Sequence, residues 1–196
     1  MIILVDNYDS FTYNLAQYIG TFADLKVIRN DSENLAAEIN KADGVVFSPG
    51  PGWPKAAGRM EALIGQFYQT KPMLGICLGH QAIAEVFGGQ LALAHETRHG
   101  KESFAEKTAE TELFADIDKA FTVMRYHSIV VESQHIPEQF IVTSKTLDDG
   151  EIMSIEHESL PIYGLQFHPE SIGTPDGLKM IENFVKIVEK NKVELN

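Results

Sequence analysis

Short strand-like segments alternate with helical patterns through the first ninety residues, and this alternation most restricts the folds open to the chain. Strands are predicted at four segments: 2–5, 26–29, 44–47 and 72–76. Helices are predicted between and after them: 11–20 with Ser10 as its cap, a second capped by Ser32, 60–68, and a fourth that follows Cys77 and stops at Gly88-Gly89. Strands that alternate with helices favour a parallel sheet.

The second half of the chain changes to short alternating runs, which predict further strands. These lie at 121–126, 140–144, 152–156 and 162–167, and Asp148-Asp149-Gly150 predicts a turn between two of them. A final helix is expected after Thr174, its predicted cap, with Pro175 in the first turn. The sequence therefore predicts an α/β fold with a mostly parallel central sheet, helices on both faces and added antiparallel strands, in one domain over residues 1–196.

Charge and composition exclude several classes of function. The 28 acidic and 16 basic residues give a net charge of −12, and no basic cluster offers a nucleic-acid footprint. No run approaches the roughly 20 apolar residues that span a bilayer, and the short apolar start lacks the basic residues of a signal peptide. One cysteine, Cys77, cannot form an internal disulfide or a cysteine-rich metal site. We therefore expect a cytoplasmic protein without a metal site.

That cysteine stands in Gly75-Ile76-Cys77-Leu78-Gly79, between a predicted strand and a predicted helix. A sharp strand-to-helix turn holds its central residue in a strained conformation and leaves room only for small neighbours, which explains the two glycines. The helix N-terminus favours a thiolate, and the N–H of Leu78 is free to stabilise an oxyanion. The alternative is a structural cysteine in a glycine-rich turn. We favour Cys77 as a nucleophile.

A nucleophilic cysteine needs a base, and His168 is the best candidate among seven histidines. It follows a predicted strand and opens His168-Pro169-Glu170, where the strand period of two puts the imidazole and the carboxylate on one side. Glu170 could then orient the imidazole. His80 is close to Cys77 in sequence but is expected to point away, while His99 and His127 remain candidates for the pocket.

A rigid turn, Ser48-Pro49-Gly50-Pro51-Gly52, follows the third predicted strand. Its prolines stiffen the loop, and its glycines permit close backbone approach and positive φ. Gly52 could offer a second oxyanion N–H. The loop lacks the glycine pattern and the lysine of a nucleotide-phosphate site, so an ordinary tight turn is the other interpretation.

Three motifs together resemble the class I, or triad, glutamine amidotransferases. They are Gly75-Ile76-Cys77-Leu78-Gly79-His80-Gln81, the turn 48–52, and Gln166-Phe167-His168-Pro169-Glu170-Ser171. The segments 6–14, His99-Gly100-Lys101 and Arg125-Tyr126-His127-Ser128 are similar to those of the glutaminase subunits of anthranilate synthase and aminodeoxychorismate synthase. The resemblance covers nearly the whole chain and implies the flavodoxin-like fold of that class.

The resemblance implies a role for each matching residue. Cys77 is the nucleophile, His168 the acid and base, and Glu170 its orienting partner; Gly52 and Leu78 supply oxyanion N–H groups, and Gly50, Gly52, Gln81, Ser128 and Ile129 hold L-glutamine. Gln81 also lies one helical turn after Cys77, on the same face. The implied partner is a chorismate-binding synthase subunit in trans, and no cofactor is implied for this chain. Docking is expected at residues 9–13 and 52–58, with Trp53 as an interface aromatic.

The residues also leave other functions open. A cysteine hydrolase of the peptidase or glyoxalase-like kind uses a similar turn but does not need His168-Pro169-Glu170 or Gln81. A signalling receiver would use Asp6 and Asp9 but needs an aspartate where Ser48 stands. A flavodoxin-like binding module would favour a glycine in the loop near Ser10. The glutaminase product could serve anthranilate or aminodeoxychorismate synthesis, or both.

Overall fold

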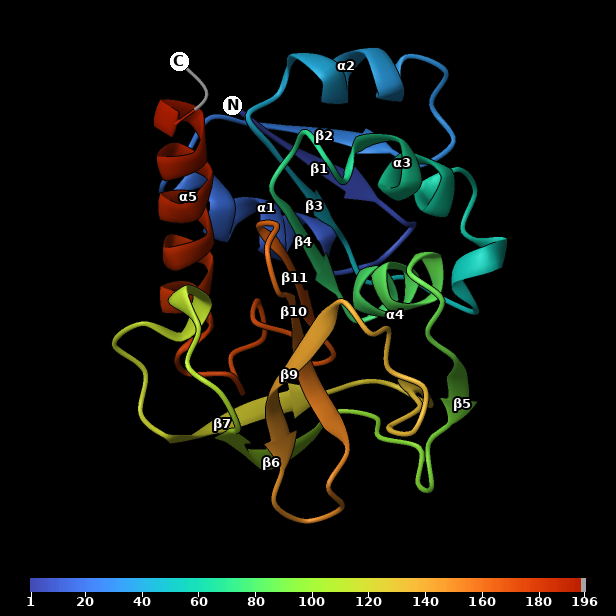
Figure 1. Cartoon of the computed structure of the whole chain (residues 1–196), viewed down its shortest axis with the longest axis vertical. Helices are drawn as coiled ribbons and strands as arrows, with labels where there is room; N and C mark the ends of the chain where they lie inside the picture. Colours follow the sequence, from blue (N-terminus) through green and yellow to red (C-terminus); the bar gives the residue numbers. More distant parts are fainter. Residues whose placement is uncertain (195–196) are drawn as a thin grey trace.

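The structure, a computed structural model, describes residues 1–194, and a central sheet runs through them (Figure 1). Within these residues the sheet has nine strands in the order β2-β1-β3-β4-β11-β10-β9-β6-β7. The first five are parallel: β2 (Leu25–Arg29), β1 (Ile2–Asp6), β3 (Gly44–Phe47), β4 (Met73–Ile76) and β11 (Ile162–Leu165). The others are antiparallel: β10 (Ile152–His157), β9 (Phe140–Thr146), β6 (Lys101–Lys107) and β7 (Ala120–Arg125). The predicted fold class is confirmed.

Burial on both faces explains why apolar and polar residues do not alternate along the central strands. Every residue of β1, β3, β4 and β11 is buried, as in parallel strands that are covered on both faces. The edge strand β2 is only partly buried, in keeping with its mixed sequence Leu25–Arg29. Three strands were not predicted: the polar β6, and the short pair β5 (Leu91–Leu93) and β8 (Ile129–Val131), which form a separate two-stranded sheet. Three-residue strands give too short a pattern for sequence analysis.

Helices cover both faces of the sheet (Figure 1). On one face lie α1 (Thr12–Gly20) and α5 (Gly177–Glu194), which pack Leu15, Ile19 and Phe184 into one apolar core. On the other face lie α2 (Leu35–Lys41), α3 (Met60–Phe67) and α4 (Leu78–Val86), which contribute to a second core. Two short 3₁₀ turns, η1 (Pro54–Ala56) and η2 (Glu112–Phe114), complete the described elements.

The three predicted helix caps are wrong. Helix α1 begins after Phe11, and α2 begins after Asn34, in both cases without a side-chain cap. At α1, carboxylates from the preceding loop take the place of a Ser10 cap: Asp9 Oδ2 accepts from the Phe11 N–H at 2.8 Å. Thr174 lies three residues before α5, and its hydroxyl donates to the His168 carbonyl instead. The competing bond at α1 is local, whereas Thr174 is drawn away from α5 by a tertiary contact with the Met124 N–H.

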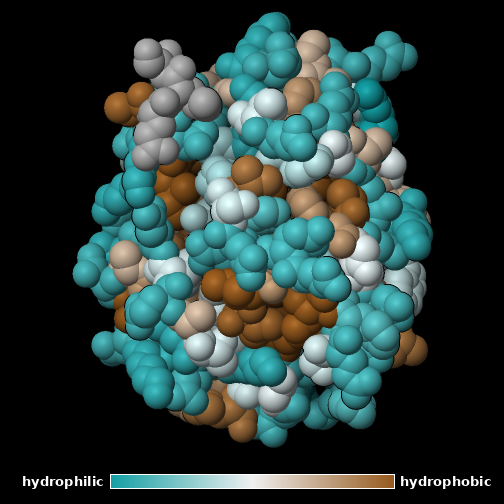
Figure 2. Space-filling model, in the orientation of Figure 1, coloured by the Kyte–Doolittle hydropathy of each residue, from teal (hydrophilic) through white to brown (hydrophobic). Residues whose placement is uncertain are grey.

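The surface in the view of Figure 1 is mostly polar, with apolar surface gathered over its lower half (Figure 2). Exposed apolar side chains of the antiparallel half include Phe104, Ile141 and Leu147. Among the described residues, no helix is both long enough and apolar enough to cross a membrane.

Candidate active site

Cys77 occupies a strained turn between β4 and α4. Its φ of 52° and ψ of −100° lie in a region that residues other than glycine rarely adopt. The turn is anchored by the Cys77 N–H, which donates to the Leu165 carbonyl of β11 at 2.7 Å. The flanking glycines are sterically required: a Cβ on Gly75 would lie 2.4 Å from backbone atoms of Gly79, and a Cβ on Gly79 would lie 2.5 Å from the Phe47 oxygen. The backbone therefore holds the thiol in one place.

His168 and Glu170 form a buried pair beside this turn. His168 Nδ1 lies 2.6 Å from Glu170 Oε1, and each residue is only 4% exposed. Burial by itself would lower the His168 pKa, but the interactions with the nearby Cys77 sulfur and with the Glu170 carboxylate outweigh it and raise the pKa well above its ordinary value. The structure therefore brings a thiol, an imidazole and a carboxylate close together. The imidazolium form of His168 can donate a proton to a departing nitrogen.

Two residues that the sequence analysis did not assign to the site hold His168 in place. The Thr174 hydroxyl donates to the His168 carbonyl at 2.7 Å and accepts from the Met124 N–H at 3.0 Å. Gly177 opens α5 so close to the turn that a Cβ there would lie 1.8 Å from the Pro169 oxygen. Thr174 thus connects the turn at His168 to β7 through two hydrogen bonds. No local sequence pattern reveals this contact.

A cavity of about 160 Å³ lies in front of Cys77. It gathers all five predicted substrate-binding residues and is lined by Gly50, Pro51, Gly52, Cys77, Gln81, Tyr126, His127, Ser128 and Ile129. His168 and Glu170 instead line an adjoining cavity of about 390 Å³ together with Phe11 and Ile172. Tyr126 lines both cavities, and its ring meets the His168 ring edge-on with centroids 5.0 Å apart. Tyr126 is therefore part of the wall of both cavities.

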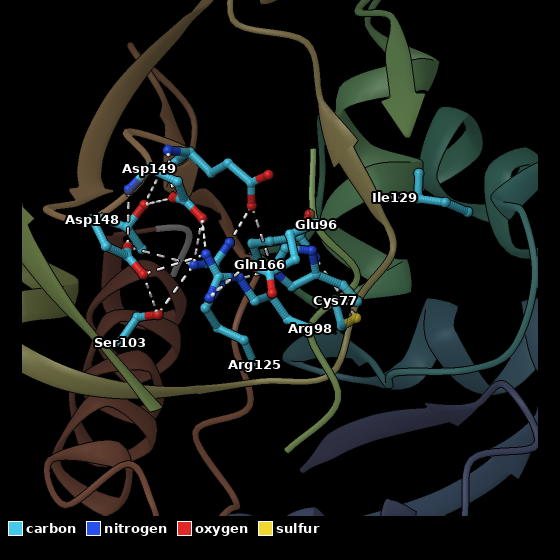
Figure 3. Close-up of polar contacts among 12 residues, drawn as sticks. Cys77, Glu96, Arg98, Ser103, Arg125, Ile129, Asp148, Asp149 and Gln166 are labelled. Carbon is cyan, nitrogen blue, oxygen red and sulfur yellow. Dashed lines mark hydrogen bonds and ion pairs between the residues drawn. The ribbon is translucent and has the colours of Figure 1, made fainter. Parts of the chain in front are cut away.

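Two glutamine side chains connect the cysteine to the wall of its cavity, and Figure 3 shows one of them, Gln166, close to Cys77. Gln81 Nε2 donates to the Ile129 carbonyl at 2.8 Å and lies 3.3 Å from Gln166 Oε1. Gln166 Nε2 in turn lies 3.7 Å from the Cys77 sulfur. The sequence analysis gave Gln166 no role, although it lies two residues before His168, the same spacing that separates His168 from Glu170. Gln81 thus reaches the cysteine through Gln166 rather than directly.

The turn 48–52 lies against the cysteine helix. A Cβ on Gly50 would lie 2.6 Å from the Asn7 carbonyl oxygen and 2.8 Å from Leu78, so glycine is required for this approach. Gly52 has a φ of +76° and open space around its α-carbon. Leu78 is the first residue of α4, where N–H groups have no partner within the helix. Backbone N–H groups from the turn 48–52 and from the start of α4 therefore lie close to the cavity that Cys77 lines.

The other histidines have different surroundings. His80 is wholly buried against Gly164, and burial lowers its pKa to about 3, so it stays neutral in the core. His99 contacts the edge of the Tyr126 ring, with ring centroids 6.0 Å apart. His127 lines the cavity in front of Cys77. Within the described chain, no group of three or more histidine, cysteine or acidic side chains is placed to hold a metal ion.

A carboxyl pair anchors the segment that follows the turn 48–52. Lys55 of η1 pairs with Glu85 of α4 at 2.8 Å, and Glu85 contacts Glu61 of α3. Burial, then the hydrogen bond and the charge of Glu85, raise the Glu61 pKa to about 7. One proton shared between the two carboxyls explains how Glu61 Oε1 and Glu85 Oε2 can both be buried without another partner within residues 1–194.

This pair predicts a pH-dependent stability. A pKa that is higher in the folded state stabilises the protein fully below the ordinary value near 4.5, and this stabilisation is lost as the pH rises through about 7. Glu61→Gln keeps a donor to Glu85 at every pH. The difference between the thermal unfolding midpoints of this variant and the wild type should therefore rise by about 2–4 °C, in favour of the variant, between pH 5 and pH 8. Thermal unfolding across that range measures the difference. The exposed Glu33→Gln is the control, and an equal gain there would contradict the shared proton.

Comparisons with known proteins agree on one family. The family model described as glutamine amidotransferase class-I matches residues 3–188. Anthranilate synthase component 2 of Lactococcus lactis is 56% identical over 196 residues, which cover 100% of this chain and 99% of that protein. Aminodeoxychorismate/anthranilate synthase component 2 of Bacillus subtilis is 44% identical, with 98% and 100% covered. A crystal structure of a putative GMP synthase subunit from Thermoplasma acidophilum superimposes with a TM-score of 0.88 at 25% identity, covering 100% and 97% of the chains.

Proposed function

The chain belongs to the class I glutamine amidotransferase family, and on that premise we propose that it is a glutaminase subunit that supplies ammonia to a chorismate-using synthase subunit. The proposal depends on one observation: Cys77, in a strained turn at a helix N-terminus, lies beside the buried His168–Glu170 pair. A helix N-terminus and an imidazolium both favour the thiolate form of a cysteine, which is the nucleophilic form.

In the first step the Cys77 thiolate attacks the side-chain carboxamide carbon of glutamine. The developing oxyanion accepts hydrogen bonds from the N–H groups of Leu78 and Gly52. His168 protonates the departing nitrogen, the C–N bond breaks, and ammonia leaves a γ-glutamyl thioester on Cys77. Glu170 holds the imidazole orientation throughout, since its carboxylate accepts from Nδ1.

In the second step water hydrolyses the thioester. His168, now neutral, takes a proton from the attacking water, the C–S bond breaks, and glutamate is released with Cys77 restored as a thiolate. Gly50, Gln81, Ser128 and the backbone of Ile129 line the cavity and hold the substrate. The two steps explain why a thiol and an imidazole are both needed.

Released ammonia must reach its acceptor before water protonates it, which favours a partner docked over the site. Exposed apolar side chains near the site support this: Tyr13 is 73% exposed and Ile172 is 97% exposed, and Phe11, Tyr8 and Trp53 are also exposed. Phe11 and Ile172 also line the cavity beside His168. We propose that the partner covers this surface, which includes the predicted loops 9–13 and 52–58.

Anthranilate is the product favoured here, because the Lactococcus lactis relative is an anthranilate synthase component at 56% identity. Aminodeoxychorismate is the second candidate, favoured by the Bacillus subtilis relative whose name carries both synthases. One glutaminase subunit could serve both acceptors.

The test is capture of the full-length chain from its native source, followed by assay of the copurified complex with glutamine and chorismate. We expect one glutamate released for each molecule of anthranilate formed, with a chorismate-using subunit in the complex. Formation of aminodeoxychorismate alone would shift the proposal to the second candidate. Absence of glutamate release in a complex that forms product from ammonia would contradict the proposed function.

A further inference from the structure

A row of aromatic side chains connects the catalytic base to the surface of the molecule. The Tyr126 ring contacts the His168 ring, with centroids 5.0 Å apart and planes at 69° to each other. The same Tyr126 ring contacts the Phe11 ring, with centroids 6.0 Å apart. Phe11 directly precedes α1 and is 42% exposed, whereas His168 is buried. We call Phe11, Tyr126 and His168 the aromatic row, because they lead from the exposed surface to the base.

One hydrogen bond holds the His168 ring. Its Nδ1 lies 2.6 Å from Glu170 Oε1, while its other nitrogen, Nε2, is buried without a hydrogen-bond partner within residues 1–194. The χ2 torsion of histidine has broad energy minima, so a bond at one atom leaves the ring free to tilt. The Tyr126 ring supplies a second contact, since aromatic rings at this separation and angle attract one another. Glu170 and Tyr126 together therefore restrict the orientation of the imidazole.

The Tyr126 side chain is itself held by its neighbours. The His99 ring lies edge-on to it, with centroids 6.0 Å apart, and a Cβ on Gly100 would lie 3.3 Å from Tyr126 Cε1. The backbone before Tyr126 is fixed as well, since the Gly100 N–H donates to the carbonyl of the fully buried Arg125 at 3.0 Å. Phe11 is the neighbour that belongs to the surface assigned to the partner. A protein docked on that surface would therefore act on Tyr126 through Phe11.

Phe11 is the exposed member of the aromatic row. It lines the cavity of about 390 Å³ beside His168, together with Ile172, which is 97% exposed. An apolar side chain of the partner that fills this cavity would bury both residues, which favours docking. It would also restrict the Phe11 ring, and with it the Tyr126 ring that Phe11 contacts.

We propose that Tyr126 is a positioning residue that orients the His168 imidazole, and that the docked partner, by covering Phe11, holds the aromatic row in place. This inference rests on the proposed function. His168 must protonate the departing nitrogen and later take a proton from water, and both transfers need the ring in a defined orientation. Misplacement of a reacting group by about 1 Å can cost about 10²-fold in rate. The aromatic row is therefore expected to act on kcat rather than on glutamine binding.

Substitutions at Tyr126 test the positioning role in the complex with the partner. Tyr126→Leu removes the ring, so kcat for glutamate release should fall about 10- to 100-fold, while KM for glutamine should stay within about threefold of the wild type. Tyr126→Phe keeps the ring and its contact with His168, so it should recover most of the loss. A rise in KM with kcat unchanged would show that Tyr126 only forms the cavity wall, and it would overturn the inference.

Glutamine binding is measured separately in the Cys77→Ala chain, where no thioester can form. Calorimetry should give the same dissociation constant with and without Tyr126→Leu, and thermal unfolding shows whether the doubly substituted chain is folded. If Tyr126→Leu weakens glutamine binding by as much as it lowers kcat/KM, the residue acts on binding and the inference fails. A wild-type complex that releases no glutamate would instead count against the proposed function.

A pair of exposed aromatic residues tests whether docking reaches the base. Phe11 is 42% exposed and Trp53 is 44% exposed, and both belong to the surface assigned to the partner, but Trp53 lies outside the aromatic row. Phe11→Ala and Trp53→Ala should both weaken binding of the partner. At saturating partner only Phe11→Ala should keep kcat about 3- to 10-fold below the wild type, because it alone removes a contact to Tyr126.

A double substitution decides whether Phe11 acts through Tyr126. In the Tyr126→Leu background, Phe11→Ala should have no further effect on kcat at saturating partner. Additive effects of the two substitutions would show that Phe11 acts by another route. Equal kcat values for saturated Phe11→Ala and Trp53→Ala complexes would show that docking does not reach His168 through the aromatic row. Either result would overturn the inference.

Discussion

Replacement of Cys77 by alanine is expected to reduce synthesis from glutamine by more than about 10⁴-fold and to leave synthesis from ammonia unchanged. The reason is that the thioester route requires the sulfur, and no other cysteine exists in the chain to replace it. Free ammonia reaches the acceptor enzyme directly and bypasses this site. Both rates are measured in the same complex, with product formation as the readout.

Two controls keep this result interpretable. The Cys77→Ala chain should copurify with its partner as the wild type does, since the alanine side chain is smaller than the buried thiol it replaces. In the wild type, a thiol reagent should label one site and lose access when glutamine is bound. Glutamine-dependent synthesis that survives in Cys77→Ala would show that the nucleophile is wrongly assigned.

Replacement of Gly75 by alanine should be the most damaging glycine substitution near the nucleophile. The new Cβ would lie 2.4 Å from the backbone carbon and oxygen of Gly79 and 2.7 Å from the His80 nitrogen. Backbone atoms cannot rotate away as a side chain can, so the turn itself must move. We expect a loss of about 3 kcal/mol in the free energy of unfolding, and a fall of about 10²-fold in glutaminase activity from displacement of the thiol. Thermal unfolding and glutamate release measure the two effects.

Gly65 offers the matched control. It lies on the exposed side of α3, and a Cβ there would meet no atom within 4 Å. Gly65→Ala should therefore stabilise the protein by about 0.5–1 kcal/mol, because alanine favours a helix more than glycine does. Activity should be unchanged. A Gly75→Ala protein with normal stability and activity would show that the turn at Cys77 tolerates side chains and is not strained in the way described.

The elements that sequence analysis predicted well are those with strong local patterns. Segments 2–5, 44–47 and 72–76 are apolar throughout, and each became a wholly buried strand. The Asp148-Asp149-Gly150 turn was predicted from its residues and connects β9 to β10, with Gly150 at a φ of +71°. The caps at Ser10, Ser32 and Thr174 were wrong: the N-cap positions of α1 and α2 lie one and two residues after the predicted caps and make no side-chain cap bond, and the Thr174 hydroxyl binds the His168 carbonyl instead. Local propensity is a weak guide where tertiary hydrogen bonds compete with it.

Strand order could not be read from the sequence. β11 follows β10 along the chain but lies between β10 and β4, where it pairs in parallel with β4. This insertion brings the segment after β11 next to the turn after β4. The juxtaposition of His168 with Cys77 is a consequence of that pairing and was inferred from sequence only through the chemistry that a cysteine nucleophile requires.

The sequence by itself determined the chemical groups and their local presentation: a cysteine between glycines at a strand end, an imidazole and a carboxylate two residues apart, and a rigid turn with free glycines. These depend on backbone sterics and strand periodicity, which act over a few residues. Only the tertiary structure decided that Gln166 contacts the sulfur, that Thr174 binds the His168 carbonyl, and that Arg125 donates to His127. Such contacts join side chains whose proximity is set by the packing of the whole sheet, and burial gives them their strength.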